Sequence, residues 1–435
     1  MYRKALKSLI EWKNNKKRKP LILEGARQVG KTWLMQEFGK TQYKNTVYVT
    51  FDNAKNRKVH DIFAQDYNTE RIIENLSVYS KIKIDPANTL IILDEIQECP
   101  NALTALKYFY ENAPQYQIVC AGSLLGIALH QGTSFPVGKV DLLNLYPLSF
   151  TEFLEAIGEK QFADLITDLN FDSIKNFKDE YIRYLKNYFY IGGMPEVVQS
   201  FIDNRDFSQV RDIQKKILET YENDFSKHLP TSAVSKTRML WNNIPMQFAK
   251  ENKKFIYGLI KHGARAKEYE NSLYWLKDCG LIYEVYRVTT PRMPLKAYGD
   301  ISSFKLFIVD VGLLCALSEI DMEILLEENA VFKEFKGSLC EQYVLQQLKA
   351  SSNKSVYYWS AEKGNAEIDF LIQNKGNIIP MEVKAGINLK AKSMQVYKEK
   401  FKPKISVRTS LADYKKTDDL YDVPLYMIEF LDKII

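Results

Sequence analysis

The sequence has 435 residues, of which 46% are hydrophobic and 26% charged, and its formal net charge is +6. This balance excludes disordered, collagen-like and coiled-coil chains, and the length predicts about three folding units. The longest apolar stretch, Phe304–Leu317, is interrupted by Lys305 and Asp310 and is shorter than the ~20 residues of a membrane-spanning helix, so we expect no membrane partner. The N-terminus lacks the apolar segment of a signal peptide, and the five cysteines form no CxxC pair. We therefore expect a protein of the reducing cytoplasm.

Residues 1–145 alternate short apolar runs with amphipathic stretches. Each run is bounded by turn or charged residues, which is typical of strands buried on both faces of a parallel sheet. The runs are Pro20–Glu24, Thr46–Phe51, Thr89–Leu93 and Gln117–Cys120. The alternation of strands and helices predicts an α/β fold for this first domain.

The middle of the chain is predicted to be mainly helical. Residues 146–226 have few strand signals and are expected to form a lid region. Residues 227–330 are basic, and their pattern predicts helices over Lys236–Glu251, Phe255–Lys261 and Ala266–Cys279, then a strand over Leu281–Val288. This is the order of a winged helix-turn-helix, although a helical lid has a similar pattern.

Residues 331–435 are predicted to form a further α/β domain. A helix is expected over Glu334–Ala350, and strands are expected over Val356–Ser360, Glu367–Ile372 and Ile378–Lys384. The last two strands flank a sequence that is typical of a hairpin turn, Asn374 to Asn377.

A phosphate-binding loop follows the first strand. Eight residues match the pattern G-x-x-x-x-G-K-[ST] and open a helix, as that motif requires. They are Gly25, Ala26, Arg27, Gln28, Val29, Gly30, Lys31 and Thr32. The glycines let backbone N–H groups turn toward phosphates, Lys31 is predicted to contact the β- and γ-phosphates, and Thr32 is predicted to bind Mg²⁺.

Two acids at the end of the third apolar run form a Walker B arrangement. Asp94 is predicted to hold the Mg²⁺ and Glu95 to orient or deprotonate the attacking water, so ATP or a related nucleotide is the expected ligand. The alternative is a chance glycine turn followed by a pair of helix-capping acids. Ser123 follows the fourth strand, where it is either a γ-phosphate sensor or an ordinary turn serine.

The predicted hairpin near the C-terminus brings two carboxylates together. Symmetric pairing about Lys375 and Gly376 places Asp369 opposite Glu382, with Lys384 on the same face. Because opposed like charges destabilise a ladder, this face is a candidate site for Mg²⁺ or Mn²⁺. The alternative is a solvated face on which these carboxylates pair with lysines.

Taken together, these motifs resemble the prokaryotic P-loop ATPases of the AAA superfamily that carry a C-terminal domain of unknown function. The matching segments are GARQVGKT, LIILDEIQ, AGS, PVGKVDLLNLYPLSFTEFL, YIGGMPEVV, LKDCGLIYEVYRV, FKLFIVDVGLLCAL, FKGSLCEQYV, AEIDFLI and MEVKAG. The resemblance implies an AAA-type core, a helical and winged-helix middle, and a restriction-endonuclease-like C-terminal domain. AAA relatives usually complete their site with an arginine from a neighbouring subunit. This sequence has Lys139 near that place, which leaves homo-oligomerisation open.

The pattern of Asp369, Glu382 and Lys384 also resembles the PD-(D/E)xK nuclease core. In that core the acids hold a metal ion at the scissile phosphate, and the lysine helps to activate water or to stabilise charge. The resemblance implies that Glu341, on the preceding helix, supplies a further acid. Such folds can also keep their shape and lose their chemistry.

The basic middle region makes DNA a candidate partner, and the alternatives are a solubilising surface or a lid. The residues expected to face phosphates are Lys236, Arg238, Lys253, Lys254, Lys261, Arg265 and Lys267. The sequence thus predicts a Mg²⁺-dependent ATPase whose nucleotide state controls DNA engagement. Two alternatives stay open. One is an ATP-gated nuclease, and the other is a nucleotide switch that binds a protein partner and carries an inactive nuclease-like scaffold.

Overall fold

The computed structural model describes residues 1–52, 57–122, 135–249, 254–326, 333–352, 354–362, 365–386 and 392–435. The chain divides into two compact units. The first comprises Arg3–Tyr146 with Asp278–Gly280, and the second comprises Met1–Tyr2, Pro147–Lys277 and Leu281–Ile435. Within the described ranges, every helix is too short or too polar to cross a membrane.

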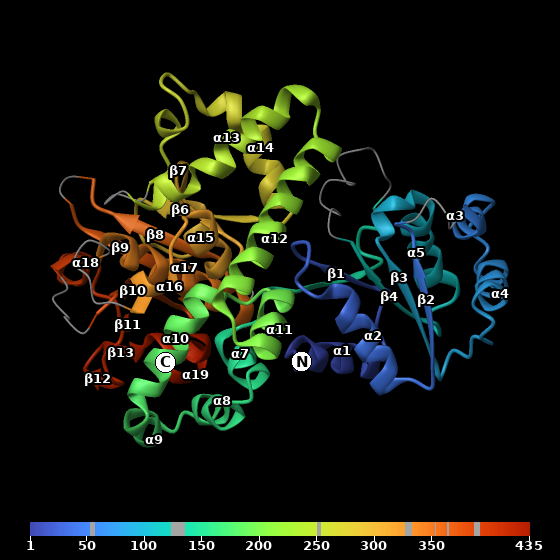
Figure 1. The fold of residues 1–435 in the computed structure, drawn as a ribbon, viewed down its shortest axis with the longest axis horizontal. Coiled ribbons are helices and arrows are strands. Elements are labelled where there is room, and N and C mark those ends of the chain that lie inside the picture. Colours follow the sequence, from blue (N-terminus) through green and yellow to red (C-terminus); the bar gives the residue numbers. More distant parts are fainter. Residues whose placement is uncertain are drawn as a thin grey trace. The chain divides into compact units, whose positions relative to one another are not determined.

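The first unit is built on a parallel sheet, shown in blue and teal in Figure 1, whose described strands have the order β2-β3-β4-β1-β5. These strands are β1 (Leu21–Glu24), β2 (Asn45–Thr50), β3 (Thr89–Asp94), β4 (Gln117–Ala121) and β5 (Asp141–Asn144). The α/β prediction for this region is therefore confirmed. The sequence did not predict β5, because this four-residue strand is half exposed and has no continuous apolar run.

Helices cover both faces of this sheet. They are α1 (Ala5–Asn14), α2 (Lys31–Gln42), α3 (Arg57–Ala64), α4 (Thr69–Ser80) and α5 (Pro100–Asn112), with a short 3₁₀ turn η2 (Ile96–Glu98). Val47 of β2 belongs to the core formed with α3, α4 and α5. Its neighbour Thr46 points to the opposite face, where Gly39 of α2 packs so closely that a Cβ would lie 2.5 Å from the Thr46 Oγ1.

Helices form the first part of the second unit, as predicted for residues 146–226. They are α7 (Phe150–Ala156), α8 (Lys160–Thr167), α9 (Phe171–Asn176), α10 (Lys178–Ile191), α11 (Pro195–Asn204), α12 (Phe207–His228), α13 (Thr231–Phe248) and α14 (Ala266–Asp278). The short helix predicted over Phe255–Lys261 is reduced to a single 3₁₀ turn, η3 (Tyr257–Leu259).

The rest of the second unit is organised around a mixed sheet with the order β12-β13-β11-β10-β9-β8-β6-β7. Its strands are β6 (Ile282–Val288), β7 (Gly299–Ile308), β8 (Val356–Ser360), β9 (Glu367–Asn374), β10 (Asn377–Val383), β11 (Ser406–Ser410), β12 (Lys415–Thr417) and β13 (Leu420–Pro424). The accompanying helices and 3₁₀ turns are η4 (Leu295–Tyr298), α15 (Val311–Leu317), α16 (Met322–Leu326), α17 (Lys333–Ser351), α18 (Lys392–Phe401), η6 (Leu425–Phe430) and α19 (Leu431–Ile434).

The strand predicted as a wing belongs to this large sheet. β6 pairs antiparallel with β7 and parallel with β8, so the sequence boundary predicted at residue 330 does not separate two sheets. The physical reason is apolar packing, because Val288 of β6 shares one hydrophobic core with Trp359 of β8 and Ile368 of β9. A free two-stranded wing would leave these side chains in water.

The β9–β10 hairpin has the predicted register. Asn377 pairs with Asn374 and Met381 with Phe370, which centres the turn on Lys375 and Gly376. Phe370 and Met381 are buried, as expected for the apolar face.

Two of the matched segments meet helix α17 at Asp310, whose carboxylate is buried. It accepts hydrogen bonds from the backbone N–H of Gly193 (2.7 Å) and Leu313 (3.1 Å) and from Nε2 of Gln346 (2.9 Å). A Cβ at Gly192 would lie 2.0 Å from the Asp310 Oδ1, so the position requires glycine. The contacts explain why an acid interrupts the longest apolar stretch, since buried polar groups require partners.

Candidate nucleotide site and acidic cavity

The P-loop connects β1 to α2, and two of its positions have backbone conformations that favour glycine. Gly25 and Gly30 have φ values of +138° and +93°. A Cβ at Gly25 would lie 2.2 Å from the carbonyl oxygen of Leu145, so a larger residue cannot occupy this position without displacing the backbone. The loop ends at the N-terminus of α2, where unpaired N–H groups and the helix dipole favour an anion.

Lys31 begins α2 and is buried with its ammonium turned toward the loop. Its Nζ donates hydrogen bonds to the carbonyl oxygens of Gly25 and Ala26, both at 2.8 Å. The pKa of Lys31 is lowered to about 8, chiefly by burial; Glu95 and Asp94 act to raise it, and Arg27 contributes to the lowering. Because the ammonium is desolvated, phosphate oxygens would replace carbonyl oxygens as its partners with little further loss of hydration.

Asp94, at the end of β3, accepts hydrogen bonds from two hydroxyl groups on one of its carboxylate oxygens. Its Oδ2 accepts from Thr32 Oγ1 at 2.7 Å and from the Tyr48 phenol at 2.9 Å. Burial raises the pKa of Asp94, and these two hydrogen bonds act to lower it. The structure thus brings together the two residues predicted to hold Mg²⁺, and it adds Tyr48, which the sequence analysis missed because a tyrosine in a strand carries no specific signal.

Glu95 follows Asp94 in the left-handed conformation, with φ of +52°. Such a backbone is uncommon for a residue other than glycine and is typical of functional turns. Its Oε2 accepts a hydrogen bond from Gln97 Nε2 at 2.5 Å, so Gln97 orients the carboxylate. Ser123, which was also predicted to act in catalysis, lies outside the described residues.

Arg3 supports the P-loop through hydrogen bonds, and nothing in the sequence indicated this role. The buried guanidinium donates to the Val29 carbonyl oxygen at 2.9 Å and to the Tyr146 carbonyl oxygen at 2.5 Å. It therefore connects the P-loop to the chain that follows β5.

The predicted carboxylates of the second unit line a polar cavity of about 460 Å³. Its walls include Glu341 of α17, Asp369 of β9 and Glu382 of β10. Lys384 also lines the cavity and pairs with Glu382 Oε1 at 2.6 Å. Glu367 of β9, which the sequence analysis did not single out, adds a further carboxylate.

A lysine from β7 lies among these acids. Lys305 is buried, and its Nζ lies 2.5 Å from Glu367 Oε1, 3.4 Å from Glu341 Oε2 and 3.8 Å from Asp369 Oδ1. The other oxygen of Asp369, Oδ2, accepts the backbone N–H of Val383 at 2.8 Å. The carboxylates predicted to hold a metal ion therefore lie against an ammonium group. Among the described residues, no three His, Cys, Asp or Glu side chains are grouped so that they could hold a metal ion.

Three family models match the chain. Residues 17–154 match an AAA domain, residues 182–323 a domain of unknown function (DUF8612), and residues 336–428 another domain of unknown function (DUF4143). Residues 17–154 form an AAA-type domain. None of the curated proteins compared with the chain matches it.

Solved structures that match the chain include the Walker-type ATPase PABY2304 of Pyrococcus abyssi, at 16% identity over 72% of this chain and 94% of that chain, with a TM-score of 0.44. Orc1 of Aeropyrum pernix in complex with DNA matches at 15% identity over 74% and 93%, with a TM-score of 0.27. AMPPCP-bound DnaA of Aquifex aeolicus matches at 14% identity over 62% and 73%, with a TM-score of 0.25. Because these identities and TM-scores are low, the assignment of the AAA-type domain rests on the family match and the P-loop geometry.

Lys139 of the AAA-type domain does not extend toward solvent as an unpaired cation. Its Nζ lies 3.0 Å from Glu111 Oε1, and both side chains are about one-third exposed.

The basic residues of the middle region differ in their surroundings. Lys261, Arg265 and Lys267 are exposed. Arg238 is half-buried and lies 3.9 Å from Glu222 Oε2, which compensates its charge. Lys236 is half-buried, Lys254 is exposed, and Lys253 lies outside the described residues. The exposed set around the start of α14 is therefore the best placed to meet phosphates.

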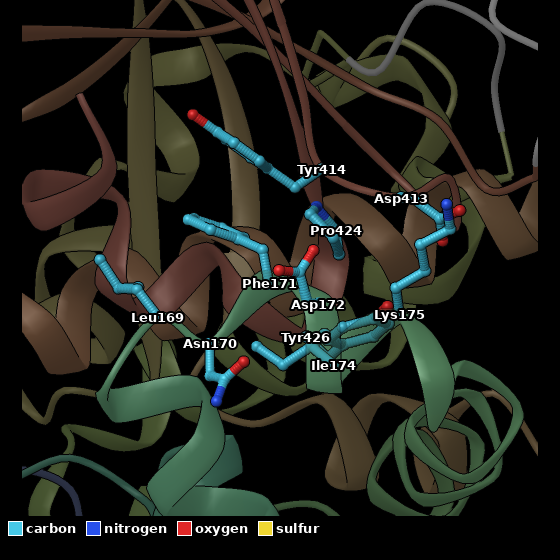
Figure 2. A pocket seen from close by; sticks show the side chains of 10 residues that line it. All are labelled: Leu169, Asn170, Phe171, Asp172, Ile174, Lys175, Asp413, Tyr414, Pro424 and Tyr426. Carbon is cyan, nitrogen blue, oxygen red and sulfur yellow. The ribbon is translucent and has the colours of Figure 1, made fainter.

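A second cavity of the same unit, of about 480 Å³, lies between α9 and the β11–β13 region (Figure 2). The rings of Phe171 and Tyr414 stack with centroids 3.9 Å apart, and Lys178 pairs with Asp413 at 2.9 Å. These contacts join α9 and α10 to the loop before β12. Because these contacts hold the elements on either side of the cavity together, we interpret it as packing between elements.

Proposed function

We propose that the protein is a Mg²⁺-dependent ATPase whose nucleotide state controls its engagement with DNA. The observation that carries the proposal is the 2.7 Å hydrogen bond between Thr32 and Asp94, which joins the P-loop to the end of β3. In P-loop enzymes such a pair holds the Mg²⁺ that bridges the β- and γ-phosphates and neutralises their developing charge.

Other residues of this chain would bind the phosphates, activate the water molecule and hold Asp94 in position. Lys31 supplies a desolvated positive charge for the phosphates, and the N–H groups of the loop and of α2 bind their oxygens. Glu95, oriented by Gln97, accepts the proton of a water molecule or fixes its direction of attack. Tyr48 and Thr32 fix the Asp94 carboxylate so that it need not reorganise when nucleotide arrives.

The first test is nucleotide binding by the full chain and by Lys31→Ala. Lys40→Ala is the matched control, since Lys40 is an exposed lysine of the same helix. We expect Lys31→Ala to weaken ATP binding by a factor of about 10 or more and Lys40→Ala to leave it unchanged. A protein that binds no ATP, or whose binding survives Lys31→Ala, refutes the proposal.

The second part of the test concerns DNA. We propose that Lys261, Arg265 and Lys267 contact phosphates, so that affinity falls with salt. The double substitution Lys261→Glu/Arg265→Glu is compared with Lys415→Glu/Lys416→Glu, an equal charge change on exposed residues of β12. Weaker DNA binding in the first variant alone, and a change on adding an ATP analogue, support the proposal. DNA binding that is equal in both variants and indifferent to nucleotide favours a switch that binds a protein partner.

An ATP-gated nuclease remains the alternative proposal for the second unit. Its support is that Asp369, Glu382 and Lys384 line one cavity. Cleavage of linear or circular DNA with Mg²⁺ or Mn²⁺ that is lost in Asp369→Ala and altered in Lys31→Ala would favour it. We favour a scaffold that binds without cutting, because Lys305 lies against Asp369 and two further acids of this cavity.

A further inference from the structure

Three acids that line the acidic cavity contact a buried lysine from outside the segment that carries them. Glu341 belongs to α17, and Glu367 and Asp369 belong to β9, whereas Lys305 belongs to β7. The side chain of Lys305 is 1% exposed, and its Nζ lies within 4 Å of all three carboxylates. The ammonium therefore stands at the point where the negative charges converge.

The electrostatics of this group favour a permanently charged lysine. Burial by itself would lower the pKa of Lys305, but Glu341, Glu367 and Asp369 outweigh that effect, and the pKa is raised. A divalent ion in the same place would need carboxylate oxygens at about 2.0–2.6 Å and would repel the ammonium. The residues as they stand do not fit a metal ion.

We propose that Lys305 takes the place of a metal ion among the carboxylates of this cavity, so that they are held together without Mg²⁺ or Mn²⁺. Lys305 is then the residue that determines whether the cavity accepts a metal, and in this chain it excludes one. The inference concerns a site separate from the nucleotide site and does not depend on ATP hydrolysis.

The charge that would remain without Lys305 makes the proposal testable. Glu382 contributes a fourth carboxylate, and its Oε2 is buried with no hydrogen-bond partner among the described residues. Four carboxylates face two ammonium groups, those of Lys305 and Lys384. Removing the charge of Lys305 leaves an excess of three negative charges and also frees the position within 4 Å of three carboxylates, where a divalent cation should then bind, whereas loss of Lys384 leaves that position occupied.

The experiment measures Mn²⁺ binding by the full chain in the absence of nucleotide, using electron paramagnetic resonance of free Mn²⁺. We expect wild type and Asp369→Asn to bind Mn²⁺ equally, and Lys305→Met to gain about one ion per chain with at least about tenfold higher affinity. The gained ion should disappear in Lys305→Met/Asp369→Asn. Lys305→Arg, which keeps the charge, and Lys384→Met, which removes the outer lysine, should both behave as wild type.

Thermal unfolding provides a second readout, because Lys305→Met leaves buried carboxylates without a counter-ion. We expect a lower midpoint for Lys305→Met that Mn²⁺ raises toward the wild-type value, and no Mn²⁺ effect on wild type. A folded Lys305→Met that gains no Mn²⁺ overturns the proposal. If Lys305→Met does not fold, the wild-type measurement decides: Mn²⁺ binding that Asp369→Asn removes overturns the proposal, and equal binding in the two proteins upholds it.

Discussion

Lys31 should give nucleotide binding a distinct pH dependence. Since burial lowers its pKa to about 8, the ammonium is charged below that pH and becomes neutral above it. Bound phosphate favours the charged form, so binding takes up a proton above pH 8. We expect the Kd of a non-hydrolysable ATP analogue to be flat near pH 7 and to rise by at most about tenfold per pH unit above pH 8.

Calorimetric titration at several pH values, in buffers of different ionisation enthalpy, measures both the Kd and the proton uptake. Lys31→Arg is the control, because a guanidinium remains charged throughout this range. Its affinity, whatever the absolute value, should show no such rise. A wild-type Kd that stays constant from about pH 7 to about pH 9.5 contradicts the lowered pKa.

Among individual residues, the sequence predicted those functional side chains that lie next to one another along the chain. Lys31 and Thr32 follow one loop, and Asp94 and Glu95 end one strand, so their roles could be read locally. Tyr48 lies 46 positions from Asp94, and Arg3 lies 143 positions from Tyr146. Such contacts depend on how strands are ordered in the sheet, which a single sequence does not specify.

The stability of the protein should depend on the backbone conformations of the two residues in the β9–β10 turn. Lys375 and Gly376 have φ of +45° and +76°, which suits a two-residue hairpin turn. Lys375→Asn should stabilise the protein by about 0.5 kcal/mol, because asparagine adopts positive φ more readily. Gly376→Ala should destabilise it by about 1 kcal/mol, through backbone strain alone, since an added Cβ meets no atom within 4 Å.

Urea unfolding monitored by circular dichroism measures both changes. Gly337→Ala is a suitable control, because this glycine lies in helix α17 and an added Cβ again has open space. There alanine should be neutral or stabilising. Equal effects of alanine at positions 337 and 376 would show that the conformation of the turn is not the cause.

The pairing of a strand could be predicted where its partner strand is close in sequence. The hairpin register follows from one turn and from alternation, and it was correct. The parallel pairing of β6 with β8 joins residues such as Tyr286 and Tyr357, about 70 positions apart, and the basic pattern around it suggested a free wing instead. Burial of Val288 in the same core as Trp359 outweighed that local pattern.

For the whole second unit, the shared sheet predicts which fragments fold. A fragment that begins at residue 331 would lose β6 and β7, leaving β8 as an open edge and the acids without Lys305. We expect it to aggregate, whereas a fragment of residues 147–435 should be monomeric and unfold cooperatively. Size-exclusion chromatography and thermal unfolding distinguish the two. A stable, monomeric 331–435 fragment would refute the dependence on β6 and β7.

The convergence of Lys305 with Glu341, Glu367 and Asp369 also constrains how such a chain can evolve. Since the three acids share one counter-ion, a neutral residue at position 305 leaves an uncompensated buried charge, and loss of the acids leaves a buried ammonium without partners. Each change is harmful until the other has occurred. Among homologues we therefore expect these four positions to change together. A lineage that lost the lysine and kept the acids would be the place to look for an acquired metal.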